Sequence, residues 1–129
     1  MPPPILRVAR PTNDIGRVAR FYTEGLGFEV LAHFEDHEGF DGIILGRRDS
    51  PWHIEFTHQH GVTVANAPTA EHLLVLYLPE REAWDAAVAR MQALGIAPCR
   101  SENPYWDRQG VTFEDPDGYR VVLQNAAWG

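Results

Sequence analysis

One order of strands and helices occurs twice along this chain, and this repetition limits the fold more than any other feature. Apolar periodicity predicts a strand, a helix and three further strands in the first half, and the same five elements in the second. The pair Leu26-Gly27 recurs as Leu94-Gly95, 68 residues later, while Arg7 matches His72 at 65 and Glu55 matches Val122 at 67. Agreement of order and spacing indicates a duplicated βαβββ module.

The first module covers about residues 5–60. It is predicted to contain a helix that begins near Asp14, with Thr12 or Asn13 as its cap, and ends at Gly25 to Gly27. Its strands are predicted at 5–9, 28–35, 41–45 and 52–57.

The second module covers about residues 70–126, after a stretch without periodicity at 58–69 that we interpret as the linker. A helix is predicted at 80–94, and a turn at Asp115-Pro116-Asp117-Gly118. The strands are predicted at 72–78, 97–101, 110–114 and 119–124, the second of these being weak.

These elements predict an α+β fold. A chain of 129 residues can build one good core but not two independent ones, so we expect a single domain over 1–129 whose two modules share an interface. Each helix must cover one face of its sheet. We therefore expect helices on the outer face of a curved, half-open sheet, with a cavity on the inner side.

Charge and cysteine content exclude several classes of function. A net charge of −7 argues against nucleic acid as a partner. The single cysteine, Cys99, excludes an internal disulfide framework, and we interpret it as a small core residue. The first residues do not resemble a signal peptide, and the longest apolar run, 73–78, is too short to span a membrane. We therefore expect a cytoplasmic protein with neither a nucleic-acid nor a membrane partner.

Alternation along the strands predicts which side chains face the cavity. Arg7 and Ala9 share one parity in the opening strand, and His53, Glu55 and Thr57 alternate with apolar residues in the fourth strand. In the second module, His72, Leu74 and Leu76 share one parity within their strand, and in the closing strand Arg120, Val122 and Gln124 lie opposite Val121 and Leu123. Charged groups among apolar neighbours are typical of a ligand cavity.

Several segments resemble the glyoxalase/bleomycin-resistance/dioxygenase superfamily, also called the vicinal oxygen chelate superfamily, over nearly the whole chain. The stretch Arg7-Val8-Ala9, Asp14, Phe21-Tyr22 and Leu26-Gly27-Phe28 resembles the opening of its first module. His53-Ile54-Glu55-Phe56-Thr57-His58 is similar to the glutamate-bearing strand of glyoxalase I, and Ala70-Glu71-His72-Leu73 to the histidine-bearing start of the second module. Phe113 to Tyr119 is similar to the closing Asp-Pro-Asp-Gly hairpin.

The resemblance implies four metal-ligand positions, which fall on Arg7, Glu55, His72 and Val122. Glu55 and His72 could bind a metal, whereas arginine and valine could not. About three protein ligands are normal for a catalytic metal. His53, His58 or a residue from a partner chain could supply a third. We therefore expect no cofactor, with a divalent Fe, Mn, Ni or Zn ion as the alternative. The resemblance also implies a homodimer.

Three functions follow from these expectations. The first is a small-molecule binding protein or metal-free enzyme, as in bleomycin resistance. The second is a metal-dependent lyase, isomerase or dioxygenase in which Glu55 and His72 are catalytic and Glu55 can act as a base. The third is a non-catalytic domain whose cavity is filled by bulky side chains such as Leu74 and Leu76. The incomplete ligand set favours the first over the second.

Individual residues allow more than one interpretation. Arg7 is predicted to pair with Glu55 in place of a metal, and either binds a substrate carboxylate or phosphate or forms a purely structural pair. His72 is a metal ligand, an acid–base group or a hydrogen-bonded core histidine. Tyr105 and Trp106 either close over a ligand or cover the sheet. His58-Gln59-His60 is interpreted as the solvated start of a loop. The predicted ligand contacts are Arg7, His53, Thr57, Leu74, Tyr105, Trp106, Val122 and Gln124.

Overall fold

The computed structural model describes residues 2–129 and divides the chain into two compact units, Met1–Val64 and Ala65–Gly129. The boundary lies inside the segment predicted to be a linker. Both units combine a sheet with helices, so the α+β prediction is confirmed. Among the described residues, no helix is both long enough and apolar enough to cross a membrane.

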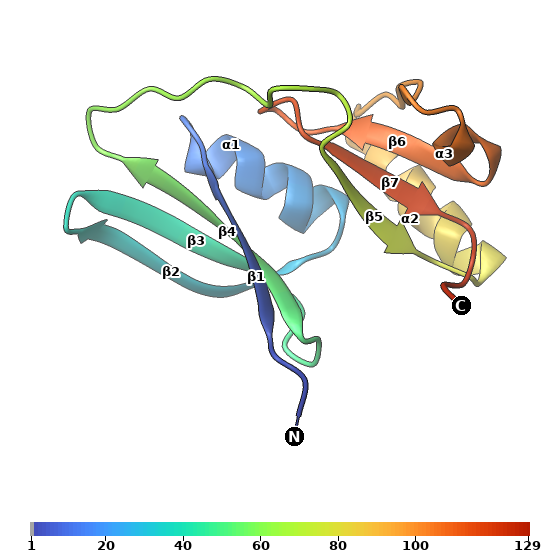
Figure 1. Cartoon of the computed structure of the whole chain (residues 1–129), viewed down its shortest axis with the longest axis horizontal. Coiled ribbons are helices and arrows are strands. Elements are labelled where there is room, and N and C mark those ends of the chain that lie inside the picture. The colour runs from blue at the N-terminus through green and yellow to red at the C-terminus, as the bar shows by residue number, and fades with distance from the viewer. Residues whose placement is uncertain (1) are drawn as a thin grey trace. The chain divides into compact units, whose positions relative to one another are not determined.

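Unit 1 contains a four-stranded sheet and one continuous helical segment (Figure 1). The strands are β1 (Leu6–Pro11), β2 (Glu29–His37), β3 (Phe40–Gly46) and β4 (Trp52–Gln59). Their order is β1-β4-β3-β2, with β1 and β4 parallel and the other pairs antiparallel. Parallel neighbours need a long crossover connection, and here the helical segment, β2 and β3 all lie between β1 and β4 in the chain.

The helical segment of unit 1 begins at Asp14, whose carboxylate accepts a hydrogen bond of 3.0 Å from the backbone N–H of Arg17. Asp14 is therefore the cap, and the prediction of Thr12 or Asn13 is wrong. The Thr12 hydroxyl instead accepts from the Asp14 N–H, and Asn13 is bound to the backbone of Val64. After α1 (Ile15–Arg20), the chain widens into the π-helical turn η1 (Phe21–Gly25).

Aromatic packing forms the core of unit 1. Tyr22 is fully buried, and its ring centroid lies 5.1 Å from that of Phe56 on the sheet and 5.7 Å from that of Phe28. Val18 from α1 and Ile54 from β4 are also buried. Burial of these side chains holds the helix on one face of the sheet, at about 1.5–3 kcal/mol for each large apolar side chain.

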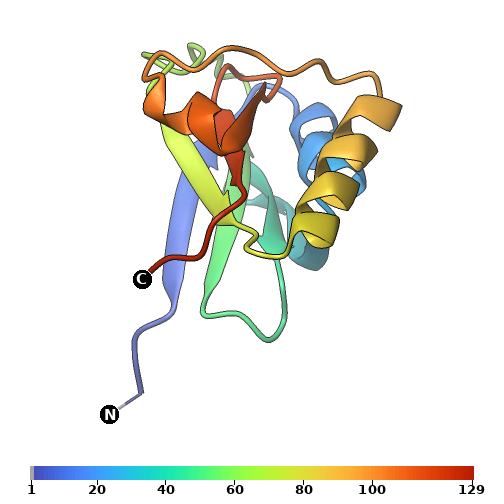
Figure 2. The ribbon, with the colours of Figure 1, turned by 90° about the vertical axis from the view of Figure 1, so that its right-hand side faces the viewer.

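Unit 2 has a three-stranded sheet, of order β5-β7-β6, and two helices. Its elements are β5 (Leu73–Tyr77), α2 (Arg81–Ala93), α3 (Tyr105–Arg108), β6 (Gly110–Glu114) and β7 (Arg120–Gln124). The long helix α2 lies along one face of this sheet (Figure 2). Trp84 of α2 donates a hydrogen bond of 2.8 Å to the Leu123 carbonyl, and Met91 is fully buried.

The repeat is less complete in unit 2 than the sequence pattern predicts. Residues 97–101 contribute only an isolated bridge between Cys99 and Thr112, so the weak strand predicted there is not formed. Pro98 lacks a backbone donor, and a proline interrupts the ladder that a strand needs. Tyr105 and Trp106 lie in the single helical turn α3, between the isolated bridge and β6.

Candidate ligand-binding face of unit 1

The sheet of unit 1 has one face against the helix and one opposite it, and strand register assigns each side chain. Burial alternates along β4, where Ile54 and Phe56 are buried against the helix. His53, Glu55 and Thr57 therefore lie on the opposite face. We call this the far face. Register adds neighbours from three strands, so that it includes Arg7, Ala9, Phe34, Ile44, His53, Glu55 and Thr57.

Arg7 and His53 are paired in register and are joined by their side chains. The Nε–H of Arg7 donates a hydrogen bond of 2.9 Å to Nε2 of His53. Because a guanidinium group can only donate, His53 Nε2 must carry a lone pair, and the ring proton resides on Nδ1. The bond fixes the direction of the arginine side chain along the far face.

Arg7 also forms an ion pair with Glu55, as the sequence predicts. Arg7 Nη1 lies 3.7 Å from Glu55 Oε2, with the arginine side chain 46% exposed and the glutamate side chain 16% exposed. This distance is too long for a hydrogen bond. Among residues 2–129, the Glu55 side chain has this ion pair and no hydrogen bond. The carboxylate is thus mostly buried, charge-compensated and short of donors.

Apolar groups surround the charged pair on the far face. Ala9 of β1 and Ile44 of β3 are the two register partners of Glu55. The Phe34 ring lies over Gly42, where an added Cβ atom would be only 2.2 Å from the ring Cζ. The absence of a side chain at Gly42 therefore makes room for this ring. The far face combines one cation, one anion and an apolar surround, as the strand parity predicts.

The four positions that the superfamily uses for a metal do not provide a suitable donor set here. Arg7 is a permanent cation that is directed at Glu55 and His53, the two side chains of the far face that could bind a metal. Val122 is apolar and fully buried within β7. Among the residues described, no three His, Cys, Asp or Glu side chains are grouped suitably for a metal ion. Two of the four positions, Arg7 and Val122, cannot bind a metal, so the four positions alone do not supply the three protein ligands that a catalytic metal normally needs.

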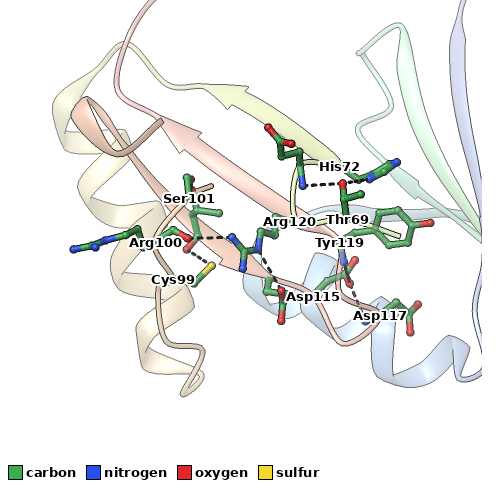
Figure 3. Close-up of polar contacts among 12 residues, drawn as sticks. Thr69, His72, Cys99, Arg100, Ser101, Asp115, Asp117, Tyr119 and Arg120 are labelled. Atoms are coloured by element: carbon green, nitrogen blue, oxygen red, sulfur yellow. Dashed lines mark hydrogen bonds and ion pairs between the residues drawn. The ribbon is translucent and has the colours of Figure 1, made fainter. Parts of the chain in front are cut away.

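His72 lies in unit 2, one residue before β5. Its side chain is exposed, Nδ1 is 2.9 Å from the Thr69 hydroxyl oxygen, and its ring meets the edge of Tyr119 at 6.1 Å (Figure 3). The interpretation of His72 as a core histidine is therefore wrong, although the hydrogen bond that it predicted is present. Metal-ligand and acid–base roles for His72 stay predictions.

The register of unit 2 corrects the predicted orientation of Leu74. Leu74 pairs with Val121 and Leu76 with Leu123, so both leucines lie on the opposite face from Val122 and Gln124. The residues of β5 that share a face with Val122 and Gln124 are Leu73, Val75 and Tyr77. An unbroken apolar run such as 73–76 carries no alternation, which is why parity could not be assigned from the sequence.

Gln124 and α3 lie close together at one end of the unit 2 sheet. Gln124 is 3% exposed, and its Oε1 atom is buried without a hydrogen-bond partner among the described residues. Gly110 lies beside both this oxygen and the Trp106 carbonyl, because a Cβ atom added to Gly110 would lie 2.4 and 2.6 Å from them. The rings of Tyr105 and Trp106 pack edge to face at 5.0 Å. Ligand contacts by Tyr105, Trp106, Val122 and Gln124 stay predictions.

Two histidines interpreted as part of a loop have defined partners in unit 1. His58 lies in β4, half-buried, with Nδ1 3.0 Å from the Thr12 carbonyl. His60 Nε2 lies 2.8 Å from Asp41 Oδ1, and this hydrogen bond raises the pKa of His60. The pKa of Asp41 is lowered, first by the Asp36 N–H and then by His60. Strand β4 is longer than predicted, and a cross-strand pairing between Asp41 and His58 could have signalled this.

A hollow of about 260 Å³ lies beside this histidine group, and the sequence pattern gave no sign of it. It is lined by Ile15, His33, Phe34, Glu35, Asp41, Gly42 and Ile43.

Cys99 is half-buried, and burial raises the pKa of its thiol. A raised pKa disfavours the thiolate, which agrees with a packing role rather than a nucleophilic one.

Comparison with known proteins places these features in a family context. A family model described as the YycE-like N-terminal domain matches residues 6–57, and the YycE-like C-terminal domain matches residues 71–125. A Bacillus subtilis protein, described as the uncharacterized protein YycE, is 40% identical over 121 residues, which are 94% of this chain and 87% of that protein. Its crystal structure, described as of unknown function with a suggested glyoxalase or fosfomycin-resistance role, matches with a TM-score of 0.87 over 95% of this chain and 89% of its own.

Two more distant structures share the fold. Glyoxalase I from Leishmania major, described as trypanothione-dependent, is 24% identical with a TM-score of 0.74, over 97% of this chain and 88% of its own. The fosfomycin resistance protein FosX from Mesorhizobium loti is 10% identical with a TM-score of 0.71, over 94% and 90%. At these identities the similarity establishes the architecture alone.

Proposed function

The chain belongs to the YycE-like family, which has the glyoxalase/bleomycin-resistance fold, and from this premise we propose that its far face binds a small molecule without a complete metal site. The observation that carries the proposal is the group Arg7, His53 and Glu55, which joins a half-exposed cation to a carboxylate that is short of donors. The crystal structure of the 40% identical YycE protein, described with a suggested glyoxalase or fosfomycin-resistance role, supports a small-molecule ligand.

Each residue of this group has a distinct role in the proposal. Arg7 compensates the charge of Glu55, as a metal would, and presents its remaining N–H groups to a ligand. His53 holds Arg7 in place through its Nε2 lone pair. Glu55 accepts hydrogen bonds from the ligand, and Thr57 offers a hydroxyl group on the same face. Binding alone requires no further chemistry, and we assign no reaction.

The metal-dependent lyase, isomerase or dioxygenase is less well supported. A divalent cation at Glu55 would lie close to the Arg7 guanidinium, and two cations at such a separation repel strongly when partly buried.

A screen of small molecules by nuclear magnetic resonance tests the proposal. A library is added to ¹⁵N-labelled protein in the presence of a chelator, and binding is mapped through the backbone amides of Ala9, Ile44 and Glu55. We expect to find ligands that shift these amide signals, and we expect the Arg7→Gln substitution to weaken the binding of those ligands. Ligands that require an added divalent metal, or that move only signals elsewhere, would contradict the proposal.

The homodimer and the cytoplasmic location stay predictions. Light scattering at micromolar concentration tests the first, and a monomeric mass would count against it.

A further inference from the structure

The far face has hydrogen-bond donors on Arg7 and acceptors on Glu55 that are not fully used within the protein. The chemistry of these groups indicates which kind of ligand would bind there. The Glu55 side chain is 16% exposed, yet among residues 2–129 no hydrogen bond reaches its carboxylate. A carboxylate that is largely withdrawn from water is stable only when donors or positive charges replace the water. The ion pair with Arg7 at 3.7 Å supplies charge but no hydrogen bond. An N–H or O–H donor on a ligand would therefore stabilise the Glu55 carboxylate.

Arg7 has the complementary surplus. One of its five N–H groups is donated to His53, and the guanidinium remains 46% exposed. The Nη groups can hold an oxyanion through two parallel hydrogen bonds, the geometry that arginine favours for carboxylates and phosphonates. Since His53 fixes the Nε end, the Nη end is the one available to a ligand.

We infer that the far face takes a small zwitterion, with its carboxylate or phosphonate on Arg7 and its ammonium group on Glu55; this rests on the proposed function. A simple anion would have to compete with Glu55 for the same guanidinium and would meet its negative charge. A simple cation would meet Arg7 in the same way. A zwitterion replaces one ion pair by two, so that neither protein charge loses its partner.

The spacing and the surround agree with a molecule of amino-acid size. Arg7 Nη1 and Glu55 Oε2 are 3.7 Å apart, so the two charges of the ligand must be separated by only two or three bonds. Ala9 and Ile44 flank Glu55 in the register, and Ala9 is too small to block the approach. Ile44 and Phe34 provide apolar surface for an uncharged substituent of the ligand.

Four probes with the same aromatic ring test this inference. Phenylglycine carries both charges, phenylacetate only the carboxylate, benzylamine only the ammonium group, and mandelate a hydroxyl group in place of the ammonium. Dissociation constants are measured from amide shifts of Ala9, Ile44 and Glu55. We expect one enantiomer of phenylglycine to bind about tenfold more tightly than each other probe, since one charge-assisted hydrogen bond contributes about that factor.

Two variants assign the charges. Glu55→Met should remove the preference for phenylglycine over phenylacetate, and Arg7→Gln should remove its preference over benzylamine. Circular dichroism and thermal unfolding verify that each variant is folded, and a variant that fails this check is replaced by Glu55→Gln or Arg7→Met.

The outcomes separate the inference from the proposed function. If phenylacetate or mandelate binds at the far face as tightly as phenylglycine, the zwitterion is wrong while small-molecule binding stands. If no probe moves these amides but the wider screen finds a ligand there, the inference alone fails. If the wider screen also finds none, both fail.

Discussion

The Nε atom of Arg7 lies 2.9 Å from Nε2 of His53, its register partner on the neighbouring parallel strand. This hydrogen bond fixes the positions of the polar side chains on the far face. It directs the guanidinium across the strand toward Glu55, and it fixes the tautomer of the histidine. The Arg7 cation thereby contacts both His53 and Glu55, the side chains of the far face that could otherwise bind a metal.

The Arg7–His53 hydrogen bond predicts that the Nε–H proton of Arg7 is protected from exchange with water. In wild-type protein the Nε–H of Arg7 should exchange slowly with water, and in His53→Leu it should exchange rapidly, because the only acceptor of that proton is lost. His53→Gln is the matched control, since its Oε1 atom can still accept. Equal exchange in wild type and His53→Leu would show that the bond is absent in solution. Loss of the bond in His53→Leu should lower the free energy of unfolding by only about 0.5–1.5 kcal/mol.

The Arg7–Glu55 ion pair should contribute little to stability. With the Arg7 side chain 46% exposed, solvent screens the attraction, so a double-mutant cycle with Arg7→Gln and Glu55→Gln should give a coupling energy of about 1 kcal/mol or less. Urea unfolding of the four proteins measures it. A coupling of about 3 kcal/mol or more would indicate a buried pair with a structural role instead.

Gly42 should be intolerant of even one added methyl group. The new Cβ atom in Gly42→Ala would lie 2.2 Å from the Phe34 ring, which must move, at a cost of about 1–3 kcal/mol. Gly16→Ala is the control: its nearest contact is an ordinary 3.6 Å and it lies within α1, where alanine is favoured by about 0.5–1 kcal/mol. Combining Gly42→Ala with Phe34→Ala should recover part of the loss attributed to the clash, and full additivity in thermal unfolding would contradict this explanation.

The His60–Asp41 pair predicts a pH dependence of stability. The pKa of His60 is raised above 6.5, chiefly by the hydrogen bond to Asp41, so its contribution is complete below pH 6.5 and is lost as pH rises through the folded-state value. The pKa of Asp41 is lowered from 3.8, so its contribution is present above that pH and is lost as pH falls through the folded-state value. The pair should therefore stabilise unit 1 most between about pH 4 and 6.5.

Nuclear magnetic resonance titration of the His60 ring measures this shift directly. In Asp41→Asn the titration midpoint of His60 should move back toward its ordinary value, while Asp36→Asn should have a smaller effect because the His60–Asp36 distance is 3.6 Å. An unchanged midpoint in Asp41→Asn would contradict the pairing.

The sequence predicts most of unit 1 because its strands are amphipathic. Alternation along β4 places Glu55 opposite Ile54 and Phe56, and the structure confirms this arrangement. Repetition, turn chemistry and the Leu-Gly pairs likewise predict the order of elements. The superfamily resemblance is confirmed by the family match together with the 40% identical YycE structure.

Predictions fail where the local sequence pattern does not distinguish between alternative arrangements. The run Leu73 to Leu76 is apolar throughout, so only the register with β7 shows that Leu74 faces away from Val122. The cap at Asp14 depends on a single hydrogen bond that three neighbouring residues could each provide. Sequence alone also could not join Arg7 to His53, since the contact depends on the parallel register of strands 46 residues apart.

Elemental metal analysis of untagged protein purified without chelator, repeated for Glu55→Ala, tests most directly whether Arg7 takes the place of a metal. The arrangement of Arg7, His53 and Glu55 predicts that neither sample contains metal near one equivalent per chain. Near-stoichiometric Fe, Mn, Ni or Zn in the wild type that disappears in Glu55→Ala would contradict it and would identify a metal centre at Glu55.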